Sequence, residues 1–220
     1  MGKKAPTTSG VINSTGTQLG LFKIMEYIAG VFDTKFNDSN KYGTSSVPSE
    51  TILHCFGLVD RYSRADGEVI PLVYNQGGTL QDPIELLPTD RWAGYMFFDR
   101  NEPIIYSVPR DYNQMSGWVT ETAKVSIIFF FNMKLQNYYT KWGSDYRIQK
   151  ETIRERILTI LTKETPKKGG QFIVKSCVDT NVAEVFKGYA VQDSKYIADL
   201  QPFYSLRFEV EISYSQPCSV

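Results

Sequence analysis

The sequence predicts an α+β fold, in which an antiparallel β-sheet carries two main helices on one face and a long loop-rich insertion. Two patterns lead to this prediction. Apolar and polar residues alternate over residues 124–135 and 204–214, and apolar residues recur at helical spacing over 21–32 and 153–161. The chain has 220 residues, of which 42% are hydrophobic and 22% are charged, enough for one substantial core. We therefore expect a single domain over residues 18–220.

Residues 1–17 are rich in Gly, Ser, Thr and Pro, so we expect a flexible N-terminal arm. Thr17 is a suitable cap for the first helix, because its hydroxyl can accept a hydrogen bond from a free N–H of the first turn. The apolar stripe of this helix comprises Leu21, Ile24, Met25, Ile28 and Phe32.

A hairpin is predicted next. Residues 51–56 are typical of a strand, and the Asp-Gly pair at 66–67 indicates a turn into a second strand at 69–74. Pro71 has no backbone N–H, which places the second strand at a sheet edge or at a bulge.

The segment 75–118 is predicted to be a loop-rich insertion, because Gly and Pro residues separate its short apolar runs at 92–98 and 104–108. We expect one or two short strands in it. A segment of this kind usually serves contacts or function rather than the core.

Strands and helices alternate in the second half. The strand over 124–135 has one wholly apolar face and one half-apolar face. Asp145 is a suitable cap for a helix that ends near Lys163. The side chains expected to be buried on this helix are Ile153, Ile157, Ile160 and Leu161.

The last three elements are a strand at 171–178, a short helical turn at 181–187 that ends at Gly188, and a terminal strand at 204–214. One face of the terminal strand is apolar. Its other face is expected to form a charged ladder toward solvent, with Arg207, Glu209 and Glu211.

The composition of the chain argues against several classes of protein. The 24 basic and 24 acidic residues balance, so neither a strongly basic nucleic-acid binder nor a polybasic membrane protein is expected. The longest apolar run, 127–131, is far too short to span a bilayer. Cys55, Cys177 and Cys218 are few and odd in number, which favours free thiols in a soluble protein made in a reducing compartment.

No catalytic motif is found. His54 and Cys55 are neighbours on a predicted strand, so their side chains point to opposite faces and do not form a nucleophile–base pair. Neither a glycine-rich phosphate motif nor a nucleophile elbow occurs. We therefore predict no enzyme activity, no catalytic residue, no cofactor and no metal ligand. An enzyme would require the acidic residues near the turn to cluster with the single histidine: Asp60, Asp66, Glu68 and His54.

Four basic residues lie on the polar side of the helix over 145–163: Arg147, Lys150, Arg154 and Arg156. Glu151 and Glu155 interrupt them. One interpretation is a solvated face with local ion pairs. The other is a face turned toward nucleic acid or an acidic partner.

Aromatic residues are in excess, with 14 Tyr, 13 Phe and 3 Trp. Aromatic side chains are enriched at protein–protein interfaces, and a monomer rarely exposes so many. We favour an interface over simple core packing. The candidate interface residues are Trp92, Tyr95, Phe97, Trp118, Tyr138, Tyr139 and Trp142.

The elements follow the order arm, amphipathic helix, strands, long strand, basic helix, strand, short helical turn and amphipathic terminal strand. This order, with the segments NVAEVFKGY at 181–189 and LQPFYSLRFEVEISY at 200–214, resembles the tail-terminator and neck-ring (head-to-tail connector) proteins of tailed bacteriophages. It resembles in particular the ring proteins of crAss-like phages that infect Bacteroides-type bacteria. The resemblance covers residues 18–60 and 120–215.

The resemblance implies a structural virion protein of the neck or tail, made in the host cytoplasm. Such proteins form a homo-oligomeric ring of six or twelve copies that surrounds the DNA channel and couples portal or connector to tail. The implied partners are other phage neck, portal and tail proteins and, transiently and without specificity, the passing DNA; no membrane is involved. By the same analogy, the basic side of the 145–163 helix lines the channel.

Two alternatives stay open beside the ring. The chain could be a small-molecule or nucleotide-binding module, which would require a concave aromatic pocket. It could also be another tail-tube or baseplate subunit, which the residues do not distinguish from a neck ring.

Overall fold

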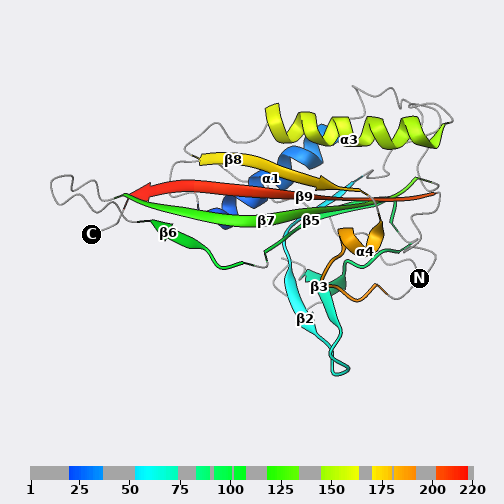
Figure 1. Ribbon diagram of the computed structural model, residues 1–220, viewed down its shortest axis with the longest axis horizontal. Helices are drawn as coiled ribbons and strands as arrows, with labels where there is room; N and C mark the ends of the chain where they lie inside the picture. The colour runs from blue at the N-terminus through cyan, green and yellow to red at the C-terminus, as the bar shows by residue number, and fades with distance from the viewer. Residues whose placement is uncertain are drawn as a thin grey trace.

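A long β-sheet runs through the middle of the protein in the computed structural model (Figure 1). The structure describes residues 20–36, 53–73, 83–89, 92–100, 102–107, 118–133, 145–163, 170–179, 181–191 and 202–217. The helices are α1 (Leu21–Phe36), α3 (Tyr146–Lys163) and α4 (Val182–Val185). The strands are β1 (His54–Leu58), β2 (Asp60–Ser63), β3 (Val69–Val73), β4 (Ile84–Glu85), β5 (Gly94–Asp99), β6 (Ile105–Ser107), β7 (Trp118–Asn132), β8 (Gly170–Val178) and β9 (Phe203–Pro217).

The main sheet has the strand order β1-β5-β7-β9-β8, and β6 also pairs with β7. β7 and β9 pair antiparallel along their whole length, from Trp118 opposite Pro217 to Asn132 opposite Phe203. Of the described strands in this sheet, β1 alone runs parallel to its partner, β5. The predicted α+β class with a mostly antiparallel sheet is therefore confirmed.

Both main helices pack on one face of the main sheet, which we call the helix face. Alternate residues of β7 from Ala123 to Phe131, and of β9 from Tyr204 to Tyr214, are buried in one cluster there. The predicted stripes of α1 and α3 join this cluster, and α1 adds Phe36. Figure 1 shows α3 on this side of the sheet, and α4 with β2 and β3 on the other.

The opposite face, which we call the α4 face, is covered by α4 and a separate sheet with the order β2-β3-β4. A second apolar cluster lies here and is dominated by aromatic rings: Phe56, Tyr95, Phe97, Phe130, Phe186 and Tyr189. Tyr95 and Phe130 stack with their ring centroids 5.3 Å apart. This cluster explains why the α4 face of β7 is half apolar: its apolar residues, Ile128 and Phe130, belong to the core.

β5 lies within the predicted insertion, yet it is a core strand. The sequence predicts that residues 75–118 serve contacts, whereas all six residues of β5 are buried between β1 and β7. Met96 and Phe98 belong to the helix-face cluster, and Tyr95 and Phe97 to the α4-face cluster. A strand buried on both faces has no apolar–polar alternation, and that alternation is the pattern that identifies a half-buried strand in a sequence.

The predicted turn at 66–67 is confirmed. Gly67 has φ 87°, and Asp66 Oδ1 accepts a hydrogen bond from the Glu68 N–H at 2.9 Å. The strand that enters the turn is β2, however, rather than the strand predicted at 51–56. Residues 54–56 of that predicted strand belong instead to β1, which pairs in the main sheet.

Pro71 lies on the middle strand of the small sheet, which corrects its predicted place at an edge or bulge. The pairing of β4 with β3 ends opposite Pro71, because Pro71 has no backbone N–H. The Leu86 N–H donates to the Pro71 carbonyl at 2.9 Å, but Pro71 has no N–H to return. The Leu86 carbonyl accepts the Tyr95 hydroxyl instead, at 3.1 Å. The predicted arm over 1–17 and the Thr17 cap lie outside the described residues.

Candidate functional site

The main sheet extends beyond the elements that cover its α4 face (Figure 1). We call this part the distal sheet: β6, residues 118–124 of β7, residues 211–217 of β9 and the start of β8. On the helix face Ala123, Ile212 and Tyr214 are still buried, whereas Val119, Glu121 and Phe172 are half-buried. On the α4 face they are half-buried or exposed: Thr120, Thr122, Lys124, Ile173, Glu211 and Ser213.

The α4 face of the distal sheet is polar and its charges are paired. Lys124 Nζ lies 3.0 Å from Glu102 Oε2, and Lys175 Nζ lies 3.4 Å from Glu211 Oε2. The surface therefore offers hydroxyl groups and neutralised charges. Affinity for DNA increases with each phosphate that an unpaired cation neutralises, so such a surface would bind DNA weakly.

The two edges of the distal sheet differ. β6 pairs with β7 among the described strands and exposes two large apolar side chains, Ile105 at 56% and Tyr106 at 60%. β8, at the other edge, has a register shift between Val174 and Ser176, and Lys175 lies at this irregularity. A bulge and a lysine discourage strand addition, so the β6 edge is the more open of the two.

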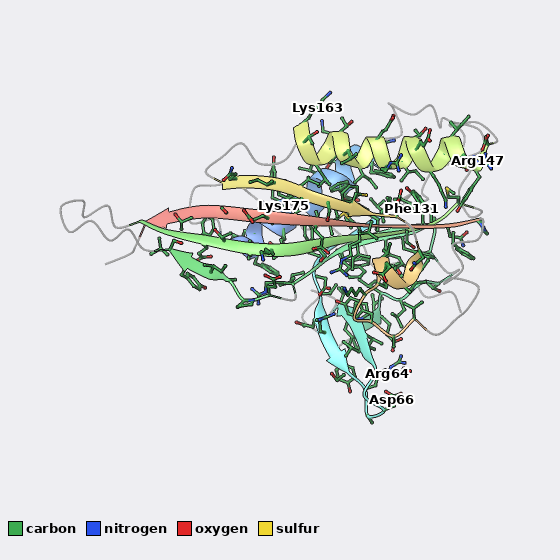
Figure 2. The ribbon with its side chains drawn as sticks, viewed as in Figure 1. Arg64, Asp66, Phe131, Arg147, Lys163 and Lys175 are labelled. Atoms are coloured by element: carbon green, nitrogen blue, oxygen red, sulfur yellow. The ribbon has the colours of Figure 1, made fainter. Side chains whose placement is uncertain are left out.

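The four predicted channel residues do not form one exposed basic surface. Arg147, Lys150 and Arg154 lie on one flank of α3, whereas Arg156 lies on the opposite flank, because nine residues at about 100° each bring a helix half a turn round. The outward side between the flanks carries Ile148, Glu151, Glu155, Thr159 and Thr162, all exposed. Figure 2 shows Arg147 and Lys163 at the two ends of the helix.

Lys150 and Arg154, on the first flank, have local partners. Lys150 Nζ lies 4.7 Å from the ring centroid of Tyr146 and 4.9 Å from that of Tyr204, close enough for cation–π contact. Arg154 Nη1 lies 2.9 Å from Asp179 Oδ2, at the end of β8. For these residues the structure favours the interpretation with local pairs.

Arg156 is the clearest departure from the predicted channel face. Its guanidinium donates to the carbonyls of Lys35 and Phe36 and lies 4.5 Å over the Phe36 ring. The last carbonyls of a helix have no partner within the helix and favour a positive charge. Arg156 therefore holds the C-terminal end of α1, and it is not available to DNA.

The predicted aromatic interface also needs correction. Tyr95 and Phe97 are fully buried in the α4-face cluster, so neither can contact another subunit. Trp92 is half-buried and packs against His54, Phe56 and Tyr95. The side chain of Trp118 and all of Tyr138, Tyr139 and Trp142 lie outside the described residues. Sequence composition found the aromatic excess, but part of that excess fills the core.

The β2–β3 hairpin projects from the α4 side of the molecule, with Arg64 and Asp66 near its tip (Figure 2). All four residues of β2 are exposed, and Tyr62 is 51% exposed. Arg64 holds the hairpin to β4, because its Nη2 donates to both carboxylate oxygens of Glu85 at 2.8 Å. Its Nη1 also donates to Glu68 at 3.4 Å, and these acceptors raise the pKa of Arg64.

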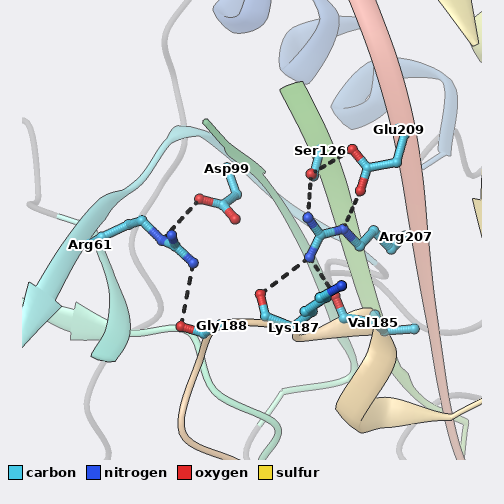
Figure 3. A network of polar contacts seen from close by, with 8 residues as sticks. All are labelled: Arg61, Asp99, Ser126, Val185, Lys187, Gly188, Arg207 and Glu209. Carbon is cyan, nitrogen blue, oxygen red and sulfur yellow. Dashed lines mark hydrogen bonds and ion pairs between the residues drawn. The ribbon is translucent and has the colours of Figure 1, made fainter. Parts of the chain in front are cut away.

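Arg207 is buried, whereas the sequence predicts that it faces solvent. Its Nη2 donates to Ser126 Oγ at 2.7 Å and its Nε to Glu209 Oε1 at 2.5 Å. Its Nη1 donates to the carbonyls of Val185 and Lys187, both at 3.4 Å (Figure 3). Alternation identified the face of Arg207 but not the α4 turn that covers it.

His54 and Cys55 point to opposite faces, as predicted. The His54 ring lies 5.2 Å from the Trp92 ring, and burial lowers the pKa of His54, although the charge of Asp33 opposes this. Cys55 is buried on the helix face, and burial with the charge of Asp33 raises its thiol pKa well above the ordinary value.

The acidic residues near the turn serve the hairpin. Asp66 closes the turn, Glu68 accepts from Arg64, and Asp60 is exposed on β2. Among the residues that the structure describes, no three His, Cys, Asp or Glu side chains come together in a way that could hold a metal ion.

No protein-family model and no curated protein sequence matches this chain. Within the described part of the chain, no helix is long and apolar enough to cross a membrane.

Proposed function

We propose that the protein is a structural virion component that forms a homo-oligomeric ring in the neck or tail of a tailed bacteriophage. In this role it couples portal or connector to tail and surrounds the DNA channel. The observation that carries the proposal is the distal sheet, which leaves one polar face and one apolar edge uncovered by the described elements of its own chain.

The contact between copies is proposed at the β6 edge. Ile105 and Tyr106 are the most exposed large apolar side chains of the described residues, and they are adjacent on one short strand. Burying such a pair against a neighbour removes apolar surface from water. The β8 edge, with its bulge and Lys175, is better suited to remain free.

The channel surface is proposed on the α4 face of the distal sheet rather than on α3. The ion pairs of Lys124 and Lys175 neutralise this surface, and the hydroxyls of Thr122 and Ser213 bond to each other at 2.9 Å. A channel must let DNA slide, and a neutral surface binds phosphates weakly. The outward side of α3 carries Glu151 and Glu155, which would repel DNA.

The test is the mass of the purified full chain by light scattering, for the native sequence and for the double variant I105S/Y106S. A mass near six or twelve times 25.1 kDa is expected for the native chain. The I105S/Y106S variant is expected to have a lower mass, because the contact between copies is lost. The matched control is Tyr62→Ser, which removes an exposed aromatic side chain from the hairpin and should leave the mass unchanged. A β6 variant that keeps the ring mass would contradict the proposed contact.

A further inference from the structure

One arginine connects three elements on the α4 side of the molecule. Arg61 of β2 places its Nε 3.5 Å from Asp99 Oδ1, at the end of β5 (Figure 3). Its Nη2 donates to the Gly188 carbonyl at 3.3 Å, and its guanidinium lies 4.8 Å over the Tyr189 ring. The small sheet, the main sheet and the turn after α4 therefore meet at one side chain.

Arg61 supplies the positive charge that compensates the buried carboxylate of Asp99. The Asp99 side chain is fully buried, and neither of its oxygens has a hydrogen bond of ordinary length within the described residues. Burial raises the pKa of the neighbouring Tyr189, and the negative charge of Asp99 raises it further. Removing the partner of a buried charge is strongly destabilising, because the remaining charge is left uncompensated.

The absence of a side chain at Gly188 leaves room for the Arg61 guanidinium. Gly188 has φ 89°, a conformation that strains any residue with a side chain, and a Cβ at this position would lie 2.6 Å from Arg61 Nη2. An alanine here would push the guanidinium away from the Gly188 carbonyl and from Asp99. The glycine that ends the predicted helical turn therefore also admits Arg61.

The turn after α4 is tied to the small sheet a second time. The Ala190 N–H donates to the Val69 carbonyl of β3 at 2.9 Å. The hairpin is itself held together, because Arg64 connects its tip to Glu85 and Glu68. Among the described residues, the hydrogen bonds of Gly188 and Ala190 join the turn to the hairpin, and the Arg61–Asp99 ion pair joins β2 to the main sheet.

We propose that Arg61, Asp99 and Gly188 form an ionic clasp that fixes the β2–β3 hairpin and the α4 turn on the main sheet as one unit. When the clasp is closed, the projecting hairpin has a single orientation. When it is broken, the hairpin and residues 188–190 open together, while Arg207 still holds the Val185 and Lys187 carbonyls and β7 and β9 stay paired. The clasp is a conformational device and does not depend on the proposed ring.

Hydrogen exchange of the full chain, read by mass spectrometry, tests the clasp. Arg61→Met should accelerate exchange of amides in residues 60–73 and 188–190 at least about tenfold, because Asp99 is left as a buried charge. Exchange in β7 and β9 should not change. Adding Asp99→Asn to Arg61→Met should restore most of the protection, since the uncompensated charge is then gone.

Arg64→Met is the matched control, because it removes an arginine from the same hairpin but only an exposed ion pair. Its effect on exchange should be several times smaller than that of Arg61→Met. Gly188→Ala should reproduce the Arg61→Met pattern from the opposite side of the contact. Equal effects of the two arginine variants, or no rescue by Asp99→Asn, would overturn the proposal, as would loss of protection in β7 and β9 to the same extent.

Discussion

The two faces of the same strands are covered in different ways. On the helix face, β7 and β9 meet α1 and α3 through one continuous apolar cluster that extends into the distal sheet. On the α4 face, an aromatic cluster gives way first to the polar contacts of the buried Arg207 and the partly exposed Arg61, and then to the open distal sheet. The difference shows that one strand pair can serve as core, as a charged junction and as exposed surface along its length.

The largest expected effect is in the core, where consecutive residues of β7 serve opposite faces. Phe129 contacts Phe32 and Phe208 on the helix face, and Phe130 contacts Tyr95 and Phe203 on the α4 face. Replacing either with alanine should lower the free energy of unfolding by about 3–5 kcal/mol, because both are fully buried. Urea denaturation measures both. A cost below about 1 kcal/mol for Phe130→Ala alone would mean that the α4 face is not packed as core.

A smaller effect is expected at the charged junction. Arg207→Met should cost about 1–3 kcal/mol in urea denaturation, because Ser126 and the carbonyls of Val185 and Lys187 lose a buried donor. Glu209→Gln is the control. Its side chain is 38% exposed, so its substitution should cost less than that of Arg207. The reverse order would show that the carboxylate, and not the arginine, organises this junction.

The pH dependence of stability reports on the thiol of Cys177. Cys177 is an exposed residue, yet partial burial of its thiol, with the charge of Asp179, raises its pKa from 9.0 to about 11. The folded state therefore holds the thiol proton more tightly than the unfolded chain does. This contribution to stability is complete below pH 9 and is lost as the pH rises toward 11.

Urea midpoints between pH 8 and pH 11 provide the measurement for Cys177. The native chain should lose more stability across this interval than Cys177→Ser does. Parallel pH profiles for the two chains would show that the thiol titrates as it does in the unfolded state.

The smallest effect is expected on the open distal sheet. Lys124 and Glu102 are both more than half exposed, so Lys124→Ala should change the free energy of unfolding by no more than about 0.5 kcal/mol. It should instead strengthen the negative charge of this surface. A loss of several kcal/mol in the isolated chain would mean that Lys124 belongs to the core.

Alternation predicted much of this fold. β7 and β9 carry their apolar residues on the predicted face, and the stripes of α1 and α3 pack against that face as expected. Gly67 and Gly188 were also predictable, because turns that need positive φ select glycine. These features depend on local patterns of a few residues.

The features that were not predicted depend on contacts between segments that are distant in the sequence. Nothing near Arg207 in the sequence shows that the turn around Val185 covers it, and nothing near Arg156 shows that it meets the end of α1 at Phe36. β5 was missed as a core strand because it is buried on both faces and so shows no alternation. Candidate site residues on such segments could be named from the sequence, but their exposure could not.

Electron microscopy of the purified full chain tests the ring most directly. Closed rings of six or twelve copies are expected, with Ile105 and Tyr106 of the β6 edge at the contact between neighbours and the α4 face of the distal sheet toward the central opening. Monomeric particles at every concentration, or rings joined through the outward side of α3 with the distal sheet turned away from the opening, would contradict it.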